Sequence, residues 1–208
     1  MKRKMFSKII SNIAISFFFT AIFVLLFYYI LDDKVDKVIS LVNMTSVHLV
    51  EKTVETEYNF ESKKLKNYPK FGTVYASLKI DKIDMDLPIY HGDTMKYLRY
   101  GVGHYAGSYF PGENGTIVLA AHNTSKFFKR IDELESGDKI VIETTYGTFT
   151  YIVDSSSIVK ETDLDAFKIT HDQEKLIMYT CYPINRSVVG RKTKRYVVYA
   201  YKEGDTSE

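Results

Sequence analysis

Three side chains that can attack and activate a carbonyl group stand where strands are expected to end or begin: His122, Cys181 and Arg195. Cys181 is the only cysteine in the 208-residue chain, and it closes an apolar run that starts after Lys175. Pro183 cannot donate to a sheet ladder, so the strand is expected to end there and to leave the thiol at its tip. A lone cysteine is more often inert packing in a core, so its place at a strand tip is what makes Cys181 a candidate nucleophile.

The three residue types divide the work of attacking a carbonyl. A cysteine reacts as its thiolate, and an unperturbed thiol has a pKa of about 8.5. His122 can act as the base, or as the acid that protonates a leaving amine. Arg195 can stabilise the oxyanion that forms, because a guanidinium keeps its charge whatever its burial.

Each assignment has a rival. His122 can equally be a hydrogen-bonded structural residue, and His104 competes with it as the base, although its glycine-rich surroundings favour a structural role. Arg195 can be a simple exposed charge at the start of a strand, with Arg191 and Lys194 as neighbouring alternatives. The other histidines are scattered along the chain: His48, His91 and His171.

No metal or other cofactor is expected. One cysteine and the lack of a His-Glu-x-x-His spacing argue against a zinc site. The glycines at 101, 103 and 107 do not follow a strand and open a helix, so no nucleotide is implied. The net charge of +2 includes +4 from residues 2–8, which leaves −2 for the remainder and no basic surface for nucleic acid.

The N-terminal region is expected to anchor the protein in a membrane. Residues 1–8 are basic and predicted to be cytoplasmic, and Ile9 to Leu31 carry no charge. As a helix this stretch spans about 34 Å at roughly 1.5 Å per residue, enough for a bilayer core of about 30 Å. The charge bias places the rest of the chain outside the cell. A cleaved signal peptide is the alternative, but no small-residue cleavage site follows.

The chain then divides into a stalk, a β-rich body and a tail. Residues 32–70 are predicted to form a helical stalk, because valine and isoleucine recur at roughly helical spacing among charges at positions 35, 38, 39, 42, 47 and 50. Residues 71–202 contain short β runs separated by turns, and 203–208 form a polar tail. About eight short strands at this spacing suggest a closed β-barrel.

The segment 101–107 is expected to be a loop, and 155–172 a polar connection with one short helical turn. The expected strands cover 73–80, 85–90, 116–121, 139–144, 148–154, 175–181 and 195–201, and short helices are expected over 94–100 and 126–134.

The body resembles the sortases, the membrane-anchored cysteine transpeptidases of Gram-positive bacteria. The Thr-Leu-x-Thr-Cys motif of that family is matched in its last two positions by Ile177-Met-Tyr-Thr180-Cys181. The family's arginine at the start of the following strand matches Arg195, and its histidine in a Gly/Ala-His setting matches His122. The resemblance covers residues 72–202 and the N-terminal anchor, and the connection between Asp154 and Glu174 is most similar to class D.

This resemblance implies an eight-stranded sortase-type β-barrel with short helices, preceded by a transmembrane helix and a stalk. It implies that Cys181 cleaves a Leu-Pro-x-Thr-type sorting motif of surface proteins after the Thr, giving a thioester. His122 would protonate the leaving amine, Arg195 would stabilise the oxyanion, and Thr180 would contribute to the oxyanion or substrate contact. An amine from a peptidoglycan precursor would then resolve the thioester.

Two other functions fit the same sequence. One is a membrane-tethered cysteine hydrolase in which water alone resolves the intermediate. The other is an anchored β-barrel that serves as a non-catalytic adaptor. Residues 55–71 lack the Asp-Pro-aromatic lid of sortases that join pilins, which favours attachment of proteins to the cell wall.

Overall fold

The structure, a computed structural model, describes residues 15–27, 56–59, 61–184 and 192–204. Residues 15–27 are helical and belong to a unit separate from the one that contains the body. Within these described ranges, no helix has both the length and the hydropathy required of a membrane span. The remainder of the expected anchor over 9–31, the basic segment 1–8 and most of the expected stalk lie outside the described residues.

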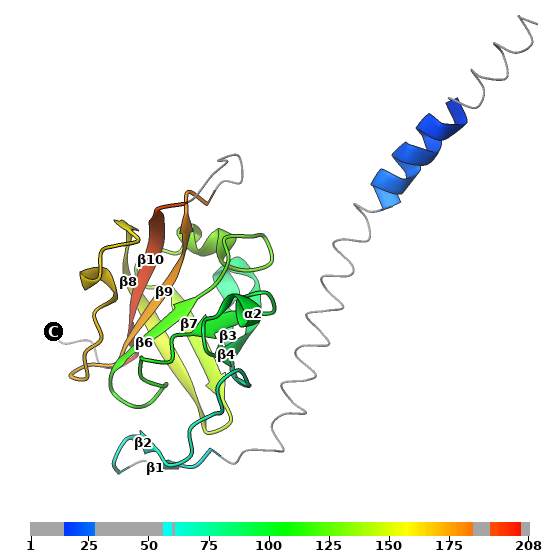
Figure 1. Ribbon diagram of the computed structural model, residues 1–208. Helices are drawn as coiled ribbons and strands as arrows, with labels where there is room; N and C mark the ends of the chain where they lie inside the picture. Colours follow the sequence, from blue (N-terminus) through cyan, green and yellow to red (C-terminus); the bar gives the residue numbers. More distant parts are fainter. Residues whose placement is uncertain (1–14, 28–55, 60, 185–191, 205–208) are drawn as a thin grey trace, which may run out of the picture. The chain divides into compact units, whose positions relative to one another are not determined.

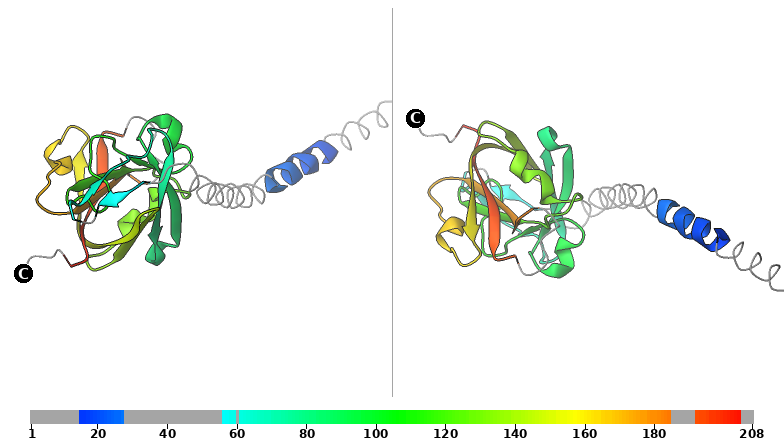
Figure 2. Two further views of the ribbon diagram at one scale, coloured as in Figure 1. Left: turned by 90° about the horizontal axis from the view of Figure 1, so that it is seen from below. Right: turned by 90° about the horizontal axis from the view of Figure 1, so that it is seen from above.

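Eight strands of the body close into a barrel, as the sequence predicts (Figure 1). Their order around the barrel is β10-β8-β7-β3-β4-β5-β6-β9, and Figure 2 shows the body from below and from above. The strands are β3 (Val74–Ile80), β4 (Met85–His91), β5 (Val102–His104), β6 (Thr116–Ala120), β7 (Lys139–Thr144), β8 (Gly147–Lys160), β9 (Lys175–Tyr182) and β10 (Lys194–Lys202).

Two of the strand pairs are parallel, and one of them determines where the candidate residues meet. β4 pairs with β5 and β6 pairs with β9 in parallel, whereas the other pairs of the barrel are antiparallel. In the second parallel pair, Thr116 lies opposite Lys175 and Ala120 opposite Tyr179. The C-terminal ends of β6 and β9 therefore lie at the same end of the barrel.

The barrel interior is filled by the apolar side chains that alternate along the strands. Adjacent residues of β9 separate in this way: Leu176 and Met178 are buried in the main core, and Ile177 belongs to a second cluster. The largest of the fully buried side chains are Tyr151, Phe128, Leu78, Ile80, Ile89, Ile117, Leu119, Ile131, Ile140, Ile142, Leu176 and Ile177.

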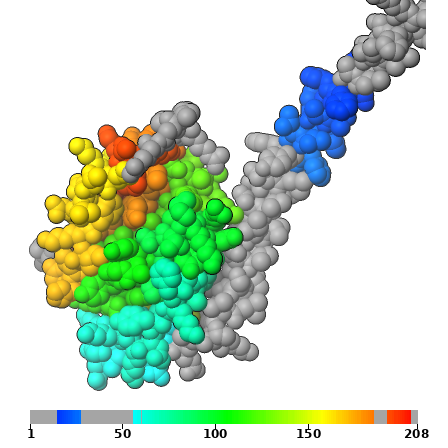
Figure 3. Space-filling view, viewed as in Figure 1, coloured from blue at the N-terminus to red at the C-terminus, as the bar shows by residue number. Residues whose placement is uncertain are grey.

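The second apolar cluster covers the outer face of the barrel beside β9. Val118, Ile177 and Val197 are buried there, and Phe167 and Ile169 from the β8–β9 connection pack against them. This connection forms the yellow-to-orange flank of the body in the space-filling view (Figure 3). β9 is consequently buried on both faces, which explains why its sequence is nearly continuously apolar.

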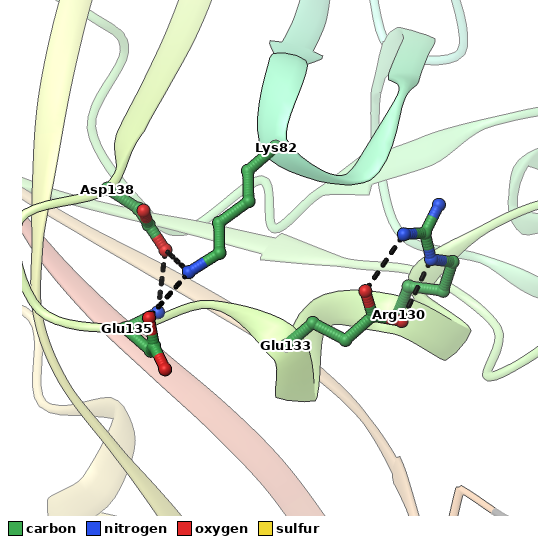
Figure 4. A network of polar contacts seen from close by, with 5 residues as sticks. All are labelled: Lys82, Arg130, Glu133, Glu135 and Asp138. Atoms are coloured by element: carbon green, nitrogen blue, oxygen red, sulfur yellow. Dashed lines mark hydrogen bonds and ion pairs between the residues drawn. The ribbon is translucent and has the colours of Figure 1, made fainter.

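Four short helices complete the body: η1 (Asp81–Ile83), α2 (Met95–Leu98), η2 (Phe128–Glu133) and η3 (Asp165–Phe167). η2 is fixed to η1, because Nη1 of Arg130 donates to the carbonyl of Ile83 at 2.9 Å. Lys82 of η1 also forms ion pairs of 2.8 Å with the carboxylates of Glu135 and Asp138, which follow η2 (Figure 4). These contacts hold the C-terminal end of the segment that leads from β6 through His122 into η2.

Three expectations about secondary structure are wrong. The segment 101–107 contains strand β5 instead of being only a loop, and β8 continues to Lys160, well beyond the expected end at 154. The pairing of β8 with β10 supplies the hydrogen bonds for this polar extension. The expected helical turn in the β8–β9 connection is confirmed as η3.

The third correction concerns the C-terminal part of the expected stalk. β1 (Tyr58–Asn59) and β2 (Lys64–Leu65) form a two-stranded antiparallel hairpin there instead of a helix. The hydroxyl of Tyr58 donates to the carbonyl of Gly112 at 2.6 Å, and the amide of Leu65 donates to Glu113 at 3.3 Å. The prediction of a helix here extends the spacing of the valines at 35–50, which does not continue into residues 58–65. The contacts with Gly112 and Glu113 attach the hairpin to the turn before β6, at the opposite end of that strand from His122.

Candidate active site

The thiol lies where the sequence predicts it. β9 ends at Tyr182, directly before Pro183, and Cys181 is a free, half-buried cysteine at this end of the strand. Cys181 is paired with β10, and β9 is also paired with β6 as far as Tyr179. Cys181 is therefore held on a rigid strand tip instead of on a flexible loop, which suits a reacting group.

Arg195 is the direct neighbour of Cys181 across the sheet. The two residues are Cα partners in the antiparallel pair of β10 and β9. Side chains of directly opposed residues project from the same face of a sheet. The guanidinium and the thiol therefore belong to one face, and Figure 1 shows the two strands side by side. The alternative Lys194 is exposed and lies opposite Tyr182, while Arg191 is outside the described residues.

The guanidinium of Arg195 is held by three hydrogen bonds. Nη1 donates to the carbonyls of Lys192 and Lys194 at 2.8 and 2.9 Å. Nη2 forms an ion pair of 2.8 Å with Glu161, and both side chains are only 20% exposed. Arg195 is therefore not a simple exposed charge at a strand start.

His122 is brought beside Cys181 by the parallel pairing of β6 and β9. The amide of Ala121 donates to the carbonyl of Tyr179 at 3.3 Å, which extends this pairing beyond the end of β6. The carbonyl of His122 accepts from the amide of Phe128 at 2.9 Å, and the imidazole is half-buried, 6.3 Å from the ring of Phe127. The structure thus brings the chain positions of all three candidates to one end of the barrel.

Asn123 is a residue of this site that is not predicted from the sequence. Its Nδ2 donates to the carbonyls of Cys181 at 3.0 Å and Pro183 at 3.1 Å. The amide therefore joins the segment after β6 to the segment after β9. The available signal was an amide side chain directly after the candidate histidine.

Thr180 faces away from Cys181. Its side chain is buried at 1% exposure, and its hydroxyl donates to the carbonyl of Ala121 at 2.8 Å. Neighbouring residues of a strand project to opposite faces, so this hydroxyl lies on the core side of β9. In the structure Thr180 fixes the position of the residue that precedes His122.

Tyr179 and Phe167 form an aromatic surface beside the thiol. Tyr179 lies two residues before Cys181, on the same face of β9, and its ring meets that of Phe167 edge-on at 4.9 Å. Burial raises the pKa of the Tyr179 hydroxyl, and the carboxylate of Asp93 adds to this effect, while Arg195 opposes it. The phenol consequently stays protonated and can donate a hydrogen bond at neutral pH.

The competing histidine, His104, has a structural role. It is fully buried in β5, and its Nε2 lies 3.1 Å from the carbonyl of Tyr109, which can only accept. Nε2 therefore carries the proton, and Nδ1 accepts from the hydroxyl of Tyr75 at 3.1 Å. Burial, reinforced by the charge of His91, lowers the pKa of His104 to about 3. A neutral imidazole without access to solvent is unsuited to exchange protons with a substrate.

Within the part of the chain that the structure describes, no three His, Cys, Asp or Glu side chains are arranged to hold a metal ion.

A family model for the sortase domain matches residues 78–203. The chain is 43% identical over 131 residues to Sortase D of Bacillus subtilis (strain 168), a match that covers 63% of this chain and 65% of that protein. It thus spans about two thirds of the length of this relative.

Solved structures lead to the same family. A sortase D5 transpeptidase from Clostridium perfringens superposes with a TM-score of 0.63 at 27% identity, over 80% of this chain and 99% of that one. A sortase C from C. perfringens, solved with the C-terminal cell wall sorting motif, gives 0.57 at 27% identity, over 85% and 91% of the two chains. The similarity to class D that the sequence predicts is confirmed. The chain therefore belongs to the sortase family, whose members are cysteine transpeptidases.

Proposed function

We propose that this protein is a sortase of the class D type, which cleaves a Leu-Pro-x-Thr-type sorting motif and transfers the released acyl group to an amine. The observation that carries the proposal is the pairing of Arg195 with Cys181 across β10 and β9, which puts a fixed cation beside the thiol. The complex of a related sortase C with a sorting motif supports the substrate class.

The first half-reaction forms a thioester. The thiolate of Cys181 attacks the carbonyl carbon of the Thr in the motif, and the negative charge moves to the carbonyl oxygen, where Arg195 stabilises it. The C–N bond to the next residue then breaks as His122 gives its proton to the departing nitrogen. The acyl group is left on sulfur, and the amine fragment leaves as a neutral molecule.

The second half-reaction releases the acyl group. An amine attacks the thioester carbonyl, His122 takes a proton from the attacking nitrogen, and the C–S bond breaks to restore the thiolate. The product is a new amide. The acceptor that fits the proposal is a peptidoglycan precursor, because its free amine and an exported protein meet at the outer face of the membrane.

The proposed location follows from the N-terminal sequence. The uncharged stretch 9–31 would anchor the protein, with the basic residues before it in the cytoplasm and the barrel outside the cell. Membrane fractionation and protease treatment of intact cells test this topology: the barrel should be cleaved from outside, while a tag before residue 1 should be protected.

The activity is tested with full-length protein in mild detergent and a quenched fluorescent peptide that contains Leu-Pro-x-Thr-Gly. The full chain is used because the hairpin of β1 and β2 packs on the barrel. An amide product that rises with the concentration of added amine supports transfer. Cleavage at a rate and with products unaffected by the amine would instead indicate the hydrolase alternative.

Mass spectrometry of the acidified reaction should show a protein adduct with the mass of the acyl fragment, and Cys181→Ala should neither form it nor cleave the peptide. A Cys181→Ala variant with unchanged cellular phenotype, together with no adduct on the wild type, would favour the adaptor alternative. Cleavage across a library of pentapeptide motifs would identify the preferred residues.

A further inference from the structure

Glu161 is the acidic partner of Arg195. We propose that it is a positioning residue: its carboxylate holds the guanidinium so that the remaining N–H groups face the carbonyl under attack by Cys181. This inference rests on the proposed function. No role is predicted for Glu161 from the sequence, because residues 155–172 are expected to form a polar connection.

The strand register places Glu161 close to Cys181 in space although the two are distant in sequence. Arg195 has Cys181 as its Cα partner in β9 and Val159 as its Cα partner in β8. These three residues form a row across the sheet, with side chains on one face. Glu161 lies two residues beyond Val159, on the same face, as a diagonal neighbour of Arg195. The extension of β8 is thus what brings this carboxylate to the site.

The main chain at Glu161 is fixed independently of its carboxylate. Its amide donates to the carbonyl of Thr193 at 2.8 Å, directly beyond the last Cα pair of β8 and β10, Lys160 with Lys194. A substitution of the side chain is therefore expected to leave the strand pairing intact. This separates the role of the carboxylate from the role of the fold around it.

The hydrogen bonds of Arg195 show which donors remain for a substrate. Both Nη1 protons are directed to carbonyls, those of Lys192 and Lys194, and one Nη2 proton is directed to Oε2 of Glu161. Among the residues that the structure describes, neither Nε–H nor the second Nη2 proton of Arg195 has a hydrogen-bond partner. A guanidinium is planar, so contacts at both terminal nitrogens fix the direction of the remaining N–H groups.

The carboxylate is needed because the other two contacts share one nitrogen. Without Glu161, the guanidinium can pivot about Nη1, and a long arginine side chain has many rotamers available to it. A charge-assisted hydrogen bond at 2.8 Å between two groups that are only 20% exposed opposes that motion. Misplacement of a catalytic group by about 1 Å can cost about 10²-fold in rate.

Two other roles for Glu161 predict a different effect of its substitution on the rate of acylation. A carboxylate that merely stabilises the fold would change the unfolding temperature without changing the rate of acylation by folded protein. A carboxylate that neutralises Arg195 and weakens its hold on the oxyanion would make Glu161→Gln faster than the wild type.

The test compares Glu161→Ala, Glu161→Gln, Arg195→Ala and the double variant Glu161→Ala/Arg195→Ala as full-length proteins. Single-turnover acylation by a quenched Leu-Pro-x-Thr-Gly peptide gives the acylation rate constant and the peptide concentration at half-saturation. We expect Glu161→Ala to lower the rate constant by about 10- to 100-fold, with half-saturation changed less than about twofold. Glu161→Gln keeps an acceptor oxygen and should lose less. The double variant should be no slower than Arg195→Ala, because Glu161 acts through Arg195.

Glu203→Ala is the matched control. Glu203 forms an ion pair of 2.7 Å with Lys139 and follows the far end of β10, roughly 26 Å from Arg195 at about 3.3 Å per residue. It should acylate at the wild-type rate.

Wild-type acylation by Glu161→Ala, a faster Glu161→Gln, or losses that multiply in the double variant would each overturn the inference. If Arg195→Ala is slow and Glu161→Ala is not, the positioning role of Glu161 is wrong and the proposed role of Arg195 is unaffected. If Arg195→Ala acylates at the wild-type rate, the proposed role of Arg195 is wrong, and the positioning role of Glu161 is wrong with it.

Discussion

The side-chain amide of Asn123 donates a hydrogen bond of 3.0 Å to the main-chain carbonyl of Cys181. The same nitrogen donates to the carbonyl of Pro183 at 3.1 Å, so both protons of the amide are directed to the segment that leaves β9. Because Asn123 directly follows His122, this one side chain joins the segments that carry the proposed acid and the proposed nucleophile. Its loss should disturb their relative position without removing a reacting group.

We expect Asn123→Ala to lower kcat by about tenfold, because the segments on either side of the site are no longer tied together. Asn123→Asp should be worse, since a carboxylate placed against two carbonyl oxygens repels both of them. The measurement is kcat and KM for cleavage of the sorting peptide, together with the unfolding temperature of each variant.

Asn59→Ala is the control for the Asn123 variants. The Oδ1 of Asn59 accepts from the amides of Glu61 and Ser62 in the hairpin of β1 and β2, so a comparable pair of side-chain contacts is removed away from the thiol. It should leave kcat unchanged. Equal loss of activity in Asn59→Ala and Asn123→Ala, or full activity of Asn123→Asp, would contradict the tie between the two segments.

Arg195→Lys tests whether fork geometry matters at the site in addition to charge. An ammonium is a point charge and cannot contact Glu161 and two carbonyls while it presents a further N–H edge to the substrate. We expect kcat/KM to fall about 10²-fold, comparable to the loss of one oxyanion donor in other enzymes. Lys194→Ala removes the neighbouring exposed charge and should be nearly as active as the wild type. Full activity of Arg195→Lys would indicate that another residue stabilises the oxyanion, and Arg191 would be the next candidate.

Elements with a strong local signal were predicted correctly from the sequence. Alternation with a final proline identifies the end of β9, and turn residues around short apolar runs predict a barrel of about eight strands. The same signals place Cys181 and Arg195 at strand ends. Their direct pairing could not be derived, because the register between two strands separated by a long loop depends on contacts across the whole barrel.

Two of the three errors share one physical cause. The polar end of β8 has no apolar alternation, and it is a strand because β10 supplies the hydrogen bonds. The hairpin at 58–65 lies beyond the last of the regularly spaced valines from which the helical stalk is predicted, and contacts with Gly112 and Glu113 hold it as strands. Both segments obtain their structure from residues far away in the chain, which local pattern does not encode. Because β8 was expected to end at residue 154, the position of Glu161 beside Arg195 could not be predicted either.

Glu174 should contribute to stability and not to chemistry. This carboxylate is 1% exposed and accepts from the amide of Gly112 at 2.9 Å, the hydroxyl of Tyr151 at 2.7 Å and the ammonium of Lys202 at 3.1 Å. Burial, together with the charge of Glu174, raises the pKa of Tyr151, so its hydroxyl remains a donor. Glu174→Ala leaves these donors without an acceptor and should cost about 3 kcal/mol of unfolding free energy.

Urea unfolding followed by tyrosine fluorescence measures this cost. Glu143→Ala is the control, because Glu143 forms an ion pair of 2.8 Å with Lys79 in which both side chains are more than a third exposed. The exposed pair should contribute less than about 1 kcal/mol. Since Glu174 precedes β9 and Cys181 lies near its other end, the folded fraction of Glu174→Ala should retain its kcat. If fully folded Glu174→Ala had a lower kcat, the end of the barrel at Glu174 would instead contribute to catalysis.

The last prediction concerns the response of the fold to acid, which should be governed in part by His104. Burial lowers the pKa of this imidazole from 6.5 to about 3 in the folded protein, whereas in the unfolded chain it returns to its ordinary value. Its contribution is present above pH 6.5 and is lost as the pH falls toward 3, because the unfolded chain binds the proton first. At pH 4.5 the loss amounts to about 2–3 kcal/mol.

We expect His104→Gln to be less stable than the wild type at neutral pH but to lose less free energy of unfolding between pH 7.5 and 4.5. His171→Gln, at an exposed position, should keep the wild-type dependence. Parallel pH profiles for wild type and His104→Gln would show that acid does not act on the barrel through His104.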